Sequence, residues 1–95
     1  MKSIWKFTLE ITDDQEIEMP VGAKILSIQQ QGGSKPGEVQ LWAMCDPEAS
    51  KERRSFRIHG TGHPITEDPG EFVATVQIMG GLQVYHVFDR GGSVN

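Results

Sequence analysis

Apolar and polar side chains alternate along short segments of this chain, and turn-forming residues separate the segments. Trp5, Phe7 and Leu9 occupy every second position near the start. In a β-strand successive side chains point to opposite faces, so this spacing predicts strands with one buried face. No segment shows a convincing helical period. The alternation therefore restricts the chain to an all-β fold.

The same pattern predicts six to seven short strands along the chain. They are expected at residues 2–11, 15–19, 23–30, 38–45, 53–59, 71–79 and 82–89. Turn signals at 12–15 and at Gly80-Gly81 predict an opening and a closing hairpin. Residues 29–37 and 60–70 are expected to form polar loops, and residues 91–95 a flexible tail.

The length of 95 residues predicts a single domain that spans residues 1–95. Strands of this number and length are typical of a small antiparallel sandwich or a partly open barrel. A chain this short buries only about 60–65% of its unfolded surface. Exposed sheet edges also need protection, so we expect a homo-oligomer.

The charges are divided between an acidic stretch at 10–18 and a basic stretch at 51–57. The net charge of −4, from nine basic and thirteen acidic residues, argues against nonspecific nucleic-acid binding. Both stretches are consistent with solvated surfaces. Alternatively, they pair with each other within or between chains, or the basic stretch binds an anion.

Two further observations concern compartment and redox state. Cys45 is the single cysteine, so no internal disulfide is possible, and its apolar neighbours predict a buried thiol. Lys2, Lys6 and Glu10 interrupt the start of the chain, and no run of eighteen apolar residues occurs. We therefore expect a cytoplasmic protein with no membrane partner.

The segment from Arg57 to Pro64 concentrates polar chemistry at the end of an expected strand. Glycine amides approach ligands closely, and guanidinium groups pair with phosphates. These properties predict a small anionic ligand, such as a nucleotide. The candidate ligand-binding residues are Arg53, Arg57, His59, Gly60, Thr61, Gly62 and His63. The alternative is a glycine-lined turn whose histidines cap backbone groups.

Metal binding and catalysis find less support in the sequence. His59 and His63 are four residues apart, a spacing that suits zinc when a helix carries both, but glycines and a proline predict a loop. His86 or Cys45 would have to supply a third ligand, and Cys45 lacks the open setting of a reactive thiol. We expect no metal, no cofactor and no enzymatic activity.

Trp42 alternates with Val39 and Leu41 and so falls on the opposite face of its strand. A large ring exposed to solvent marks a contact surface. Met44 shares that face, and Ile4 joins it if the two strands are neighbours. Trp42, Met44 and Arg54 are the candidate protein-interface residues.

Several segments together resemble an uncharacterised family of small proteins from tailed bacteriophages. They are Ile4–Ser27, Leu41–Pro47, Arg57–Ile65 and Gly80–Phe88, nearly the whole chain. The resemblance implies a short accessory phage protein made inside a bacterium, in the host cytoplasm. It carries no active-site assignment.

From the residues and this resemblance we expect a non-catalytic phage protein that binds and inhibits or sequesters a host factor, plausibly in antiviral defence. Its partner would be a host protein, bound through the Trp42 face, or a small anionic ligand, bound at the 57–63 segment. The alternative is a structural, assembly or regulatory phage protein with no ligand.

Overall fold

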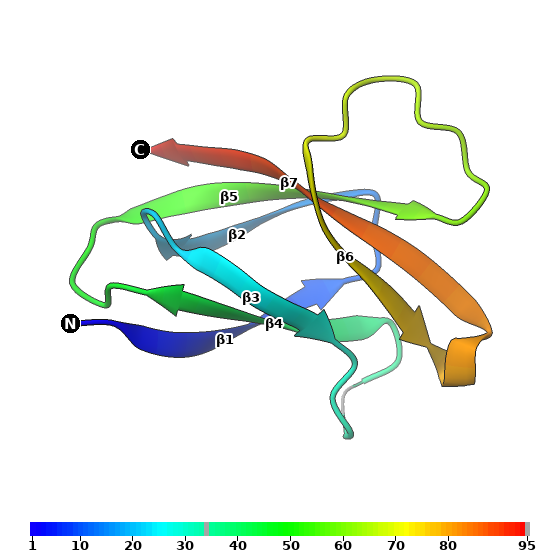
Figure 1. The fold of residues 1–95 in the computed structure, drawn as a ribbon, viewed down its shortest axis with the longest axis horizontal. Helices are drawn as coiled ribbons and strands as arrows, with labels where there is room; N and C mark the ends of the chain where they lie inside the picture. Colours follow the sequence, from blue (N-terminus) through cyan, green and yellow to red (C-terminus); the bar gives the residue numbers. More distant parts are fainter. Residues whose placement is uncertain (34, 95) are drawn as a thin grey trace.

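The computed structural model describes residues 1–33 and 35–94 as two antiparallel β-sheets packed into a small sandwich (Figure 1). The strands are β1 (Ser3–Glu10), β2 (Asp14–Pro20), β3 (Lys24–Gln29), β4 (Glu38–Cys45), β5 (Lys51–Gly60), β6 (Glu71–Ile78) and β7 (Gln83–Val94). One sheet has the order β1-β4-β3 and the other β2-β5-β7-β6. The all-β prediction is confirmed, in its sandwich form. None of the described residues belongs to a helix long and apolar enough to cross a membrane.

The core lies between the two sheets and is filled by the alternating side chains. Leu9, Leu41, Phe56 and Val87 are fully buried, and the Cys45 thiol is buried with them. Trp5 packs against this core from β1 and carries the Lys51 ammonium 4.7 Å from its ring centroid. Each strand thus presents one face to the core, as the alternation predicts.

The predicted opening hairpin is wrong, because β1 and β2 belong to different sheets. β1 pairs with β4, from Ser3 opposite Cys45 to Glu10 opposite Glu38, whereas β2 pairs with β5. The backbone between them bonds to both sheets. The Ile11 amide donates to the Gly37 carbonyl over 2.8 Å, and the Asp13 carbonyl accepts from the Ile58 amide over 3.0 Å. A turn signal marks a chain reversal, but it does not specify which strand becomes the hydrogen-bonded neighbour.

The predicted closing hairpin is confirmed. β6 and β7 pair antiparallel, and a short 3-10 turn, η1 (Met79–Gly81), joins them. Gly80 and Gly81 both have positive φ, at 68° and 92°, as a tight turn at this pair requires. Met79 also has positive φ, at 53°.

The expected C-terminal tail is wrong for residues 91–94, which continue β7 and pair with the first half of β5. Asn95 lies outside the described residues. β5 begins at Lys51, two residues before the expected strand, and residues 91–94 provide the neighbouring strand for its first half. Gly92 lies opposite Arg54, and a side chain at Gly92 would occupy the space of the Glu52 carboxylate. Gly92 is therefore required by this part of the sheet, where a side chain would collide with Glu52.

Register shifts alter which side chains face inward. In β6 a shift between Phe72 and Ala74 leaves Phe72 55% exposed, although alternation places it on the face of the buried Val76 and Ile78. A bulge contributes an extra residue and reverses the alternation beyond it. The long 61–70 loop between β5 and β6 agrees with its prediction. The other predicted loop, before β4, includes Ser34, which lies outside the described residues.

Candidate functional site

The arginines predicted to bind an anion, Arg53 and Arg57, lie on β5 at the outer face of the four-stranded sheet. The neighbouring strand in that sheet is the acidic strand β2. Asp14 is directly opposite Arg57, and Glu18 is directly opposite Arg53. Arg57 Nη1 lies 3.0 Å from an Asp14 carboxylate oxygen, and Arg53 Nη1 lies 4.0 Å from Glu16 Oε1. Of the alternatives that the sequence left open, pairing of the two charged stretches within the chain is the one observed.

The surroundings of Arg57 are not predominantly basic. A shallow hollow beside it contains two guanidinium groups, Arg57 and Arg90, and three carboxylates, Asp14, Glu16 and Glu67. Arg90 also lies 3.7 Å from Asp14. An anion entering this hollow would meet more negative than positive side chains, and like charges oppose its binding.

The glycine loop after β5 uses much of its hydrogen-bonding capacity internally. The Thr61 amide donates to the Val84 carbonyl over 3.3 Å, and the His63 amide donates to the Gly60 carbonyl over 3.2 Å. Gly62 takes a positive φ of 87°. These bonds close the turn and give the Thr61 and His63 amides backbone partners.

The three histidines have different environments. Thr61 Oγ1 lies 2.8 Å from His86 Nε2, and Thr75 Oγ1 lies 2.9 Å from His86 Nδ1. The His59 ring contacts Phe88 edge-on at 5.8 Å between centroids, and its buried Nε2 has no hydrogen-bond partner among the described residues. The His63 ring stands where a Gly60 side chain would be. Within residues 1–33 and 35–94, no group of three His, Cys, Asp or Glu side chains is placed to hold a metal ion.

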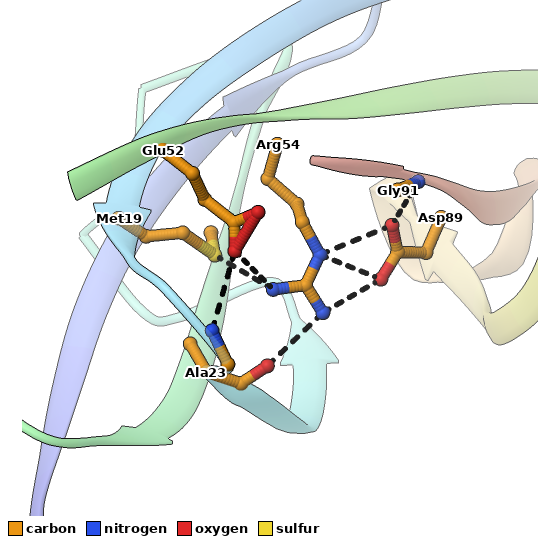
Figure 2. A network of polar contacts seen from close by, with 7 residues as sticks. Met19, Ala23, Glu52, Arg54, Asp89 and Gly91 are labelled. Carbon is orange, nitrogen blue, oxygen red and sulfur yellow. Dashed lines mark hydrogen bonds and ion pairs between the residues drawn. The ribbon is translucent and has the colours of Figure 1, made fainter. Parts of the chain in front are cut away.

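Arg54, which was predicted as an interface residue, is largely buried within the chain. It lies at one end of the sandwich interior, in a polar network with Glu52 and Asp89 (Figure 2). Its Nη2 is 2.9 Å from Asp89 Oδ2 and donates over 3.0 Å to the Ala23 carbonyl. The three side chains are only 11–14% exposed. This guanidinium therefore joins β5 and β7 to the turn before β3.

The carboxylates of that network are also held by backbone amides. The Gly22 amide donates to Glu52 Oε2 over 3.3 Å, and the Gly91 amide donates to Asp89 Oδ1 over 2.8 Å. Figure 2 shows the Glu52 and Asp89 carboxylates on either side of the Arg54 guanidinium. The network satisfies buried charges inside one chain, which is a structural role.

Trp42 and Met44 lie on the outer face of the three-stranded sheet, as parity predicts. Ile4 on β1 is directly opposite Met44, and Lys24 on β3 is directly opposite it on the other side. In the next row Lys6 is directly opposite Trp42. Directly paired side chains share one face of a sheet. We call these five residues, Ile4, Lys6, Lys24, Trp42 and Met44, the Trp42 patch.

The Trp42 patch exposes apolar surface without a covering strand. Ile4 is 59% exposed, and Trp42 and Met44 are half-buried. Lys6 Nζ donates over 2.9 Å to Gln31 Oε1. Gln31 follows β3, which lies on the other side of β4 from Lys6 on β1. The next row is polar, with Thr8 bonded to Gln40 over 3.0 Å. The apolar surface is thus confined to one end of this face.

Sequence reasoning found Trp42, Met44 and the link to Ile4, but missed the two lysines. Alternation within a strand assigns faces, whereas the position of Lys24 beside Met44 depends on pairing between β3 and β4. That pairing includes a shift between Ile25 and Ser27. No local signal specifies such a shift.

Comparisons with curated proteins and with solved structures give no match to the chain. A family model does match residues 1–94, nearly its whole length. The chain therefore belongs to the family described as a domain of unknown function, DUF7352.

Proposed function

We propose that this protein is a non-catalytic accessory protein of a bacteriophage that binds and inhibits a host protein through the Trp42 patch. The observation that carries the proposal is the exposed apolar row on the outer face of the three-stranded sheet. Aromatic and methionine side chains are enriched at the centres of protein interfaces. The phage origin rests on the resemblance of the sequence, and a role against antiviral defence follows from that origin.

The geometry favours this mechanism over capture of a small anion. Arg53 and Arg57 lie beside carboxylates of β2, and the Thr61 and His63 amides donate to backbone carbonyls. A ligand there would have to displace these interactions. At the Trp42 patch, in contrast, Ile4 is 59% exposed, and Trp42 and Met44 are half-buried and present part of their apolar surface to solvent.

Trp42→Ala is expected to weaken binding of the host partner by roughly ten- to a hundredfold, because aromatic side chains at interface centres contribute most of the affinity. The partner would first be isolated from lysate of infected bacteria and then purified. Its affinity for wild type and variant would be measured by calorimetry. Circular dichroism would verify that the variant keeps the β-fold.

Two matched variants complete this test. Leu82→Ala removes an apolar side chain that is 82% exposed in the β6–β7 turn, and should leave the affinity unchanged. Arg57→Ala should leave it unchanged as well. If Arg57→Ala abolishes binding of a nucleotide while Trp42→Ala has no effect, the anion mechanism is correct instead. Detection of the protein in purified virions, without a host partner, would favour the structural alternative.

A further inference from the structure

The arginines of this protein form ion pairs within the chain, whereas the lysines of the Trp42 patch form none among the described residues. Each of the four arginines lies within 4.0 Å of a carboxylate, in the pairs Arg53–Glu16, Arg54–Asp89, Arg57–Asp14 and Arg90–Asp14. All four belong to the four-stranded sheet. Each guanidinium group therefore has a carboxylate neighbour within the chain, so the arginines of the basic stretch do not present free positive charge.

The lysines of the Trp42 patch have no such compensation. The partner of Lys6 is the neutral amide of Gln31, and within residues 1–33 and 35–94 neither Lys6 nor Lys24 forms an ion pair. Both side chains belong to exposed residues. Lys6 lies beside Trp42 on β1, and Lys24 lies beside Met44 on β3, so the two lysines are on opposite sides of β4. The patch is thus apolar along its middle strand and positive on both flanks.

This arrangement discriminates between possible occupants. A second copy packed face to face would bring four uncompensated ammonium groups into one interface, and like charges there repel. A nucleic acid would meet two lysines on a chain whose net charge is −4, which opposes a dense polyanion. A protein segment with carboxylates on either side of an apolar or aromatic side chain matches both the charge and the apolar character.

We infer that the Trp42 patch binds an acidic segment of a partner protein, with carboxylates paired to Lys6 and Lys24 and an apolar side chain packed on Trp42. This inference rests on the proposed function, in which the same patch is the binding surface. It adds the chemistry of the partner. Electrostatic complementarity of this kind sets specificity and the rate of association.

Fluorescently labelled polypeptides would test the inference through their anisotropy on titration with the full-length protein. The probes are a random glutamate–tyrosine copolymer and a lysine–tyrosine copolymer of equal length. We expect the acidic copolymer to bind and the basic one not to bind. Affinity for the acidic probe should fall severalfold between about 0.05 and about 0.5 M salt, because added ions screen exposed charges.

Charge reversal of the two lysines supplies the decisive comparison. The double variant Lys6→Glu/Lys24→Glu should weaken binding of the acidic copolymer by at least about tenfold, since attraction becomes repulsion. The control is Lys35→Glu, which reverses an exposed lysine in the connection before β4 and should bind like wild type. Equal binding of the two copolymers, or an unchanged affinity of the double variant, would overturn the inference.

Two outcomes separate this inference from the proposed function. If the purified host partner is lost on Trp42→Ala but binds the double lysine variant normally, the patch is the interface and its partner is not acidic there. If an oligothymidine probe binds more tightly than the acidic copolymer, and the lysine reversal abolishes it, the patch recognises nucleic acid and the inference is wrong.

Discussion

Arg54→Ala is expected to lower the free energy of unfolding by about 3–5 kcal/mol, because it leaves two largely buried carboxylates without their cation. Glu52 and Asp89 would keep only single amide donors, from Gly22 and Gly91. Such a loss is a large part of the stability of a domain this small. Urea denaturation followed by tryptophan fluorescence would measure it.

The neighbouring arginine is a matched control. Arg53 pairs with Glu16 on the solvent-facing side, where both side chains are more than half exposed. Arg53→Ala should therefore cost at most about 1 kcal/mol. Arg54→Lys keeps the charge but not the planar fork of donors, and should fall between the two. Equal losses for the two alanine variants would show that the network does not stabilise the fold.

Gly70→Ala is expected to destabilise the protein by about 2–4 kcal/mol, from positive-φ strain and a steric collision together. Gly70 precedes β6 and has a φ of 102°. An added Cβ would lie 2.5 Å from the Asp89 carbonyl oxygen and 3.0 Å from Arg90 Cα. Both are backbone atoms, which cannot rotate away, so β6 would have to separate from β7. Thermal unfolding by calorimetry would measure the loss.

Gly62→Ala isolates the conformational part of this effect. Gly62 also has positive φ, at 87°, but an added Cβ there would meet no atom of the described residues within 4 Å. Its cost should be about 1–2 kcal/mol, the strain of a left-handed backbone alone. If Gly62→Ala proves as damaging as Gly70→Ala, the collision with β7 is not the cause.

Alternation along the chain was sufficient to predict the strands and the inward face of most of them. For Arg54 the alternation also indicated the buried position that the structure shows, although Arg54 was predicted as an interface residue. Arg54 has the parity of Phe56 and Ile58, both buried. Its charge suggested an exposed interface residue, whereas its position predicted the interior. A charged residue at a position that the alternation places in the interior therefore indicates a buried ion-pair network.

Strand pairing could not be predicted, because it depends on contacts between distant parts of the chain. The turn before Gln15 separates two strands that join different sheets, and nothing in its residues distinguishes this from a hairpin. The bulge at Phe72 and the pairing of residues 91–94 depend in the same way on a neighbouring strand. Local sequence specifies each element, whereas packing of the whole domain selects its partner.

In the candidate site, too, features set by a single strand could be predicted, whereas features set by strand pairing could not. The orientation of Trp42 followed from its own strand. The neutralisation of Arg57 by Asp14 required knowledge that β2 and β5 pair, and the position of Lys24 required the register of β3 against β4. The charge clusters in the sequence therefore did not reveal that the arginines among them are paired with carboxylates.

The order of strands also has a kinetic consequence. Among the strands of the described residues, only β3–β4 and β6–β7 pair segments that follow each other in the chain, one pair in each sheet. The β1–β4 and β2–β5 pairings instead close loops of several tens of residues, as with Ser3 and Cys45. Loop-closure entropy opposes such contacts until they are reinforced, and topologies of this kind fold in milliseconds to seconds. We therefore expect the β3–β4 and β6–β7 hairpins to form first, and β1 and β2 to pair later with β4 and β5.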